Sequence, residues 1–149
     1  MSETNDSITD RLIDRASGNE SACATIEDRR NTERHPYTLL VGLVLLDENR
    51  ELLPPLLLRA RDISVEGIGL SSRGPLGVGK QGVLQLVRSN GNLALAGVEV
   101  MHCRYVKDLE HIVGLCFIPM PTGFRTEDFL DEQGRLTLFD PLLQSNLKP

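Results

Sequence analysis

Apolar residues in the middle of the chain form six short runs, and each run ends in a polar or turn-forming segment. The runs cover residues 37–46, 56–63, 67–72, 83–87, 93–106 and 112–118. Short apolar runs bounded by Gly, Pro, Asn and Asp are typical of strands, and the segment Ser89-Asn-Gly-Asn92 is a strong hairpin signal. No helical pattern separates the runs. The sequence therefore predicts an all-β fold, either an antiparallel barrel or a sandwich.

Two short helices are expected outside this region. From about residue 8 to residue 16 the apolar side chains fall on one helical face. Ser7 and Asp10 resemble a capping box at its start, and Gly18 follows its end. A helix this short is marginal unless it packs against the rest of the protein. Residues 126–131 predict a turn or two of C-terminal helix with Thr126 as its cap.

The charge of the chain is concentrated at its N-terminus. Residues 1–28 carry seven acidic side chains against Arg11 and Arg15, whereas the remainder is neutral. We expect three parts: an acidic tail with the helix and a linker (1–28), a β domain (29–120) and a C-terminal helix with its tail (121–149). No basic stripe is visible, and aromatic residues are few, which argues against DNA or RNA as a partner. Most of the basic residues are Arg, which favours bidentate recognition of anions.

Several other classes of site are not expected. Three cysteines with no C-x-x-C spacing argue against a disulfide framework or a zinc site, and Cys103 and Cys116 are expected to be reduced thiols. The longest apolar run, residues 39–46, is too short to cross a bilayer, so we expect a cytoplasmic protein with no membrane insertion. No nucleophile has a visible base and orienting partner, and no histidine has metal-ligand spacing. We therefore expect no catalysis, no metal and no cofactor.

Two short motifs carry the candidate chemistry. Arg30-x-x-x-Arg34 precedes the first apolar run, and Asp62-x-Ser64-x-x-Gly67 lies at the turn between the second and third runs. The arginine spacing alone is weak, because it recurs in the acidic N-terminal segment. The second motif is expected only about 0.05 times by chance in a chain of this length. Guanidiniums, a carboxylate, a hydroxyl and a glycine together suit an anionic ligand that carries guanine.

At these residues the chain resembles the PilZ domain, a bacterial receptor module for cyclic di-GMP. The resemblance begins with Arg29, Arg30 and Arg34, and extends through the second motif to Gly69-Leu70. Residues 97–104 and 113–117 also resemble the closing strands of that family, so the likeness covers roughly residues 29–120. It implies a six-stranded antiparallel barrel, with a flexible arginine loop that folds over the ligand.

The resemblance also implies a role for each matching residue. Arg30 and Arg34 would grip the phosphates and the Hoogsteen edges of the guanines, because an arginine fork matches O6 and N7. Asp62 would accept from the guanine N1 and N2 protons, and Ser64 would add a hydroxyl contact. Gly67 would let the backbone approach closely. Arg29 is a further candidate contact.

Other interpretations stay open from the sequence. Arg30 and Arg34 could instead pair with Asp28 and Glu33, and the second motif could be a turn that satisfies its own backbone. The expected function is a cyclic di-GMP receptor that relays the signal to a downstream protein by ordering its arginine loop. The alternative is an adaptor that docks a partner protein without any nucleotide. An enzyme acting on a nucleotide would need an acid–base or metal site, which the sequence does not offer.

Overall fold

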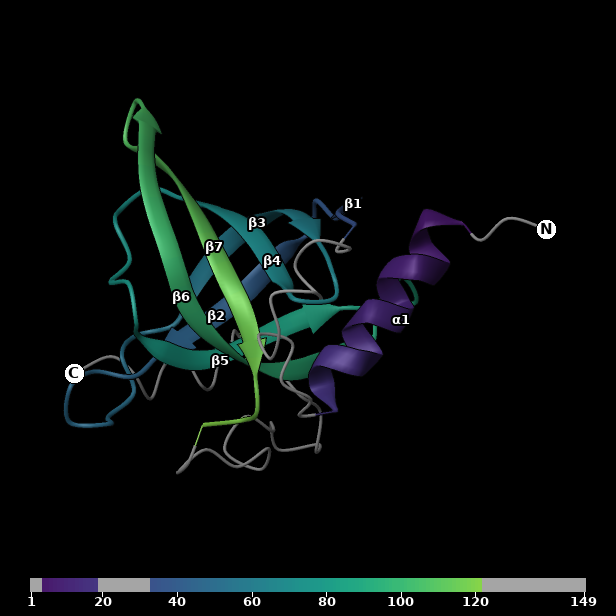
Figure 1. The fold of residues 1–149 in the computed structure, drawn as a ribbon, viewed down its shortest axis with the longest axis horizontal. Helices are drawn as coiled ribbons and strands as arrows, with labels where there is room; N and C mark the ends of the chain where they lie inside the picture. The colour runs from purple at the N-terminus through teal and green to yellow at the C-terminus, as the bar shows by residue number, and fades with distance from the viewer. Residues whose placement is uncertain (1–3, 19–32, 122–149) are drawn as a thin grey trace.

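The computed structural model describes residues 4–18 and 33–121, which form one helix and seven strands (Figure 1). In chain order the elements are α1 (Asn5–Ser17), β1 (His35–Pro36), β2 (Leu40–Leu45), β3 (Leu56–Ile63), β4 (Gly67–Ser72), β5 (Gln81–Val87), β6 (Leu93–Lys107) and β7 (Glu110–Ile118). The predicted linker from residue 19 to 28 and the predicted helix at 126–131 lie outside the described residues.

Strands β2 to β7 close into an antiparallel barrel. The strand order is β1-β3-β2-β5-β6-β7-β4, and an additional pairing between β3 and β4 closes the ring. The predicted six-stranded barrel is therefore confirmed, and the choice between barrel and sandwich is settled. The strand predicted at 37–46 is shorter in the structure, where β2 covers Leu40–Leu45. Residues 37–39 separate it from β1, and both β1 and β2 pair with β3. The short strand β1 is the one addition to the predicted set.

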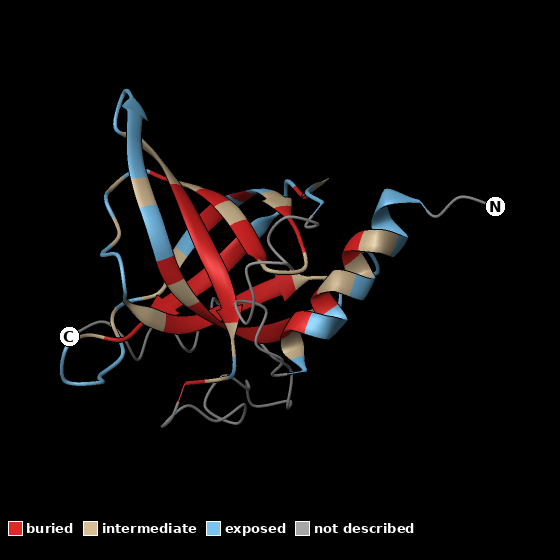
Figure 2. Ribbon diagram, viewed as in Figure 1, coloured by how far each residue is buried: buried red, intermediate tan, exposed pale blue. Residues whose placement is uncertain are grey.

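The barrel interior is filled by apolar side chains, and along β3 and β4 the buried residues alternate with more exposed ones. Along β3, for example, Leu58 and Ala60 are buried while Arg59 is exposed. Figure 2 shows that buried residues are concentrated on the strands of the barrel. The largest fully buried side chains include Phe117, Leu43, Ile63, Ile68, Leu70, Leu84 and Leu86.

Reduced thiols were expected at both Cys103 and Cys116, and the structure has one at only one of these two positions. Cys103 is a free, half-buried cysteine on β6. Cys116 on β7 is disulfide-bonded, which corrects the expectation of a reduced thiol at that position.

Helix α1 covers one side of the barrel and is capped one residue before its first turn. Its N-cap is Thr4, whose hydroxyl accepts from the amide of Ser7 at 3.1 Å, so the predicted capping box at Ser7 is wrong. The helix packs against β6 and β1 and buries Thr9, Ile13 and Ala16 (Figure 2). Burial of this face supplies the packing partner that so short a helix needs. Within the described residues no helix is long and apolar enough to span a membrane.

Two polar contacts fix α1 to the turn between β5 and β6. Both carboxylate oxygens of Asp10 accept from Ser89, at 2.8 Å from the amide and 2.5 Å from the hydroxyl. Asp14, one helical turn beyond Asp10, accepts a hydrogen bond from Arg88 Nε at 2.8 Å. The side-chain hydrogen bond from Ser89, helped by its backbone N–H, lowers the pKa of Asp10 below its ordinary value. The helix is thus held at defined points and not by apolar contact alone.

Candidate functional site

The two sequence motifs meet at the edge of the barrel. Arg34 directly precedes β1, and the pairing of β1 with β3 places Pro36 opposite Asp62. The Arg34 Nη1 atom lies 2.6 Å from Asp62 Oδ1, which joins residues 28 positions apart in the chain. Arg34 therefore does not pair with Glu33, whose carboxylate lies 3.7 Å from His35 instead. The other two predicted arginines, at positions 29 and 30, lie outside the described residues.

Asp62 faces outward because β3 contains a β-bulge. Ala60 pairs with Leu70 and Asp62 pairs with Gly69, so Arg61 is an extra residue with no partner on β4. In a regular strand the buried Ala60 would put Asp62 on the same, inner face, because side chains alternate with a period of two. The bulge restores Asp62 to the outer surface, where its side chain is 34% exposed.

Ser64 and Gly67 close the turn between β3 and β4. The Ser64 amide donates to the Gly67 carbonyl at 2.8 Å, and the Ser64 hydroxyl lies 3.3 Å from both the amide and the carbonyl of Gly67. Ser64 is fully buried. A Cβ atom on Gly67 would lie 2.0 Å from the Leu115 carbonyl oxygen of β7. Both residues therefore have a structural role: they hold the turn that carries the rim of the site.

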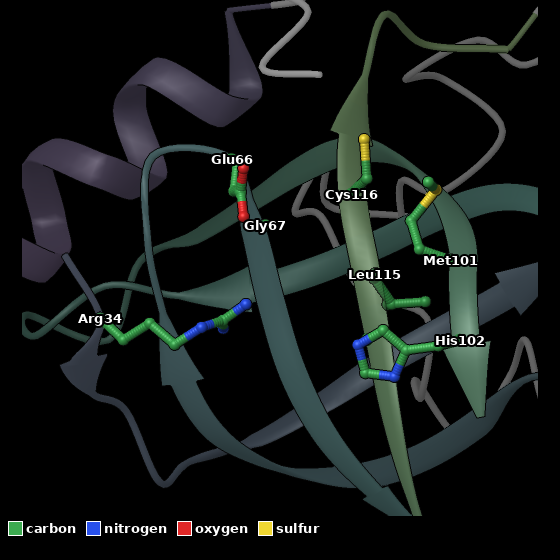
Figure 3. Close-up of a pocket in the computed structure, with 8 residues that line it drawn as sticks. Arg34, Glu66, Gly67, Met101, His102, Leu115 and Cys116 are labelled. Carbon is green, nitrogen blue, oxygen red and sulfur yellow. The ribbon is translucent and has the colours of Figure 1, made fainter. Parts of the chain in front are cut away.

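A pocket of about 300 Å³ adjoins the two motifs. Figure 3 shows Arg34 on one side of it and the β6 side chains Met101 and His102 on the other, with β4 and β7 between them. The full lining is Arg34, Glu66, Gly67, Met101, His102, Gly114, Leu115 and Cys116. Of these, only Arg34 and Gly67 were predicted as site residues. The β6 and β7 members carry no motif, and only the closure of the barrel brings them to the site.

The polar groups at this rim are available for a ligand. The side chains of Arg34 and Asp62 are 47% and 34% exposed, and an exposed ion pair of this kind contributes only about 0–1 kcal/mol to stability. Among the described residues, the other N–H groups of Arg34 and the second oxygen of Asp62 have no hydrogen-bond partner. A ligand can therefore bind the guanidinium donors and the carboxylate acceptor while the protein loses little stability from a weakened ion pair. Within the described ranges, no group of three or more His, Cys, Asp or Glu residues could hold a metal ion.

Comparison with known proteins identifies the family of the chain. The family model of the PilZ domain matches residues 28–128, which is more than half of the chain. No curated protein matches the sequence. Among solved structures, the chain is similar to the "PilZ domain with c-di-GMP of YcgR from Escherichia coli", with 16% sequence identity and a TM-score of 0.45. That match covers 60% of this chain and 77% of the other. The range of the family match contains both motifs and the whole lining of the pocket.

Proposed function

We propose that this chain, which belongs to the PilZ domain family, is a receptor for cyclic di-GMP. The observation that carries the proposal is the 2.6 Å contact of Asp62 with Arg34, which itself lines the pocket. It joins a motif of guanidiniums to a motif with a carboxylate. A guanine-containing phosphodiester needs both kinds of group, because its phosphates are anionic and its base carries donors as well as acceptors.

Each group of the pair has a complementary part of the ligand. The remaining N–H groups of Arg34 suit a phosphate or the O6 and N7 atoms of guanine, which a guanidinium binds bidentately. The second carboxylate oxygen of Asp62 suits the N1 and N2 protons of guanine. Arg29 and Arg30 precede Arg34 on the same segment and are assigned to the phosphates. Charge-assisted hydrogen bonds contribute about 1.5–3 kcal/mol each, so four or five of them support micromolar or tighter binding after the ordering costs.

Ser64 and Gly67 support this site from within the fold. The buried hydroxyl of Ser64 and the close approach of Gly67 to β7 keep the β3–β4 turn in place. We assign these residues to the rigidity of the rim on which Asp62 is carried. This assignment places ligand binding mainly on the arginines and Asp62.

Calorimetric titration of the full chain with cyclic di-GMP tests the proposal. We expect saturable binding heat for the native protein and a loss of at least tenfold in affinity for Arg30→Ala, because a charge-assisted contact is removed. The matched control is Arg11→Ala, since Arg11 and Arg15 repeat the same spacing on α1. Absence of heat for the native chain contradicts the receptor. A product of linear dinucleotide on incubation with magnesium would indicate an enzyme instead.

We propose that ligand binding to residues 29–34, called the arginine segment because it carries Arg29, Arg30 and Arg34, changes the position of helix α1. Unliganded, the three arginines repel one another, and the phosphates of the ligand cancel this repulsion and order the segment. The contacts of α1 support a mechanical link, since Asn5 donates to the carbonyl of Pro36 on β1 at 3.0 Å, two residues beyond Arg34. A downstream protein partner would then bind the N-terminal region with a different affinity when the ligand is present.

A second candidate function is an adaptor that docks a partner protein and needs no nucleotide. The hairpin of β6 and β7 extends beyond the barrel (Figure 1) and exposes apolar side chains, with Tyr105 at 59% and Leu109 at 67%. Exposed apolar groups gathered on one element are typical of protein contacts. The same titration discriminates the two functions, because an adaptor of this kind gives no heat with cyclic di-GMP and is indifferent to Arg30→Ala.

A further inference from the structure

Four residues on four neighbouring strands form a row across the outer surface of the barrel. Asp62 of β3 pairs with Gly69 of β4, Gly69 pairs with Gly114 of β7, and Gly114 pairs with His102 of β6. The row therefore has a polar side chain at each end and two glycines in the middle. Such a row is a shallow floor, because the two central positions carry no side chain.

A β-bulge accounts for the presence of each polar end. On β6, Val100 pairs with Leu115 and His102 pairs with Gly114, so Met101 is an extra residue in the same way as Arg61 on β3. Val100 is fully buried, and regular alternation would point His102 inward with it. The bulge turns both Met101 and His102 to the outer face, where they line the pocket opposite Arg34 (Figure 3). Bulges are frequent beside binding sites, where they redirect a side chain.

On the outer surface, the side chains of Asp62 and His102 each lie over the glycine with which the residue pairs. A Cβ atom on Gly69 would lie 2.8 Å from Asp62 Oδ1, and one on Gly114 would lie 2.1 Å from His102 Nε2. The two ring atoms bonded to that nitrogen would lie 2.6 and 2.7 Å away, so the imidazole lies over the glycine and not beside it. One face of the ring is therefore against β7, and the opposite face is open, since His102 is exposed. Among the described residues the ring has no hydrogen-bond partner.

We propose that His102 is a ligand-binding residue whose imidazole stacks on a guanine base while Asp62 binds the edge of the same base. This inference rests on the proposed function and deepens it by adding a residue from β6. The tips of the Asp62 and His102 side chains lie over neighbouring strands, which are about 4.8 Å apart. A base stacked on the open face of the imidazole thus lies within reach of the carboxylate. The chemistry requires only a planar ring, because every base has a π-face.

Four variants test the role of the ring in calorimetric titrations with cyclic di-GMP. We expect His102→Ala to weaken binding by about tenfold or more, which is the usual effect of removing an aromatic partner from a base. His102→Phe keeps a flat ring and is expected to bind within about threefold of the native protein. Gly114→Ala keeps the histidine but displaces it, because the new Cβ meets the ring of the His102 side chain, and it is expected to weaken binding as well. His111→Ala is the matched control, since His111 lies on β7 outside this pocket.

The outcomes separate this inference from the proposed function. If the native protein binds and His102→Ala binds equally well, the role of His102 is wrong while the receptor stands. If His102→Phe is as weak as His102→Ala, stacking is wrong. If the native protein gives no binding heat, both the receptor function and the role of His102 are wrong. The thermal midpoint of each variant is measured alongside, and a midpoint within about 2 °C of the native value shows that affinity, and not folding, has changed.

Discussion

At the scale of single residues, the site depends on where two β-bulges fall. The identities of Arg34 and Asp62 could be predicted from the sequence because both belong to a spaced motif. The outward position of Asp62 and His102 could not, because a bulge is a property of the register between two strands. No local signal at Arg61 or Met101 marks them as extra residues. For the same reason His102, which belongs to no motif, could not be selected as a site residue from its position in the chain.

The glycines of β4 have separable roles, which two alanine substitutions can distinguish. In Gly67→Ala the new Cβ meets the backbone oxygen of Leu115 at 2.0 Å, so β4 and β7 must move apart. We expect the free energy of unfolding to fall by about 1–3 kcal/mol, as for other overpacked positions. In Gly69→Ala the Cβ meets only the end of the Asp62 side chain. We expect a change in stability of less than about 1 kcal/mol and at least tenfold weaker binding of cyclic di-GMP.

Urea denaturation and calorimetry of the two variants provide the measurements. The roles assigned here require opposite profiles, with Gly67→Ala defective in stability and Gly69→Ala defective in binding at near-native stability. Native affinity in Gly69→Ala would show that the position of the Asp62 carboxylate does not matter to the ligand.

At the scale of elements, the turn signals in the sequence predicted the existence of the strands, but not the residues at which each strand begins. The first residues of the predicted run 37–46 lie between β1 and β2, and pairing with β3, not the apolar pattern, decides where β2 begins. The N-cap of α1 was also misplaced. Ser7 and Thr4 are both good capping residues, and the local pattern does not discriminate between them. The helix itself was predictable because its apolar face is regular.

The docking of α1 is expected to depend on acid pH through Asp10. Hydrogen bonds from Ser89 hold the pKa of Asp10 below its ordinary value of 3.8. A carboxyl group with a lowered pKa in the folded state contributes stability that is present above the unfolded pKa and is lost as the pH falls through the folded one. We therefore expect the contribution of Asp10 to be complete at neutral pH and to disappear below 3.8.

Denaturation at a series of pH values between about 2 and 6 measures this effect. In Asp10→Asn the corresponding part of the pH dependence should vanish. Glu48→Gln is a matched control, because Glu48 is an exposed acid in the turn after β2. Identical pH profiles for native protein and Asp10→Asn would mean that the Ser89 contacts do not stabilise the docked helix.

At the scale of the whole molecule, closure of the barrel is what assembles the site. The hydrophobic pattern predicted six strands but left a barrel and a sandwich open, and the family resemblance supplied the choice. Pairing of β4 with both β3 and β7 then brings the Asp62 motif beside the residues of β6 and β7. These contacts join parts of the chain far apart in sequence, and no local pattern encodes them.

The proposed relay predicts a change in susceptibility to protease. If the ligand orders the arginine segment, cleavage between residues 17 and 29 should slow when cyclic di-GMP is added, because a protease needs an extended, accessible backbone. Mass spectrometry of timed digests identifies the cleaved bonds. Arg34→Ala is the control that should show no protection. Equal cleavage of the native protein with and without ligand would contradict the relay but not the binding.

The central claim is that Arg34 and Asp62 form one binding site for cyclic di-GMP. It is tested most directly by calorimetric titration of the native chain, Arg34→Ala and Asp62→Ala, with the free energy of unfolding measured for each. The predicted result is micromolar or tighter binding by the native chain, a loss of at least tenfold in each variant, and a change in stability below about 1 kcal/mol, since the pair is exposed. Native affinity in either variant, or no heat from the native chain, would contradict the claim.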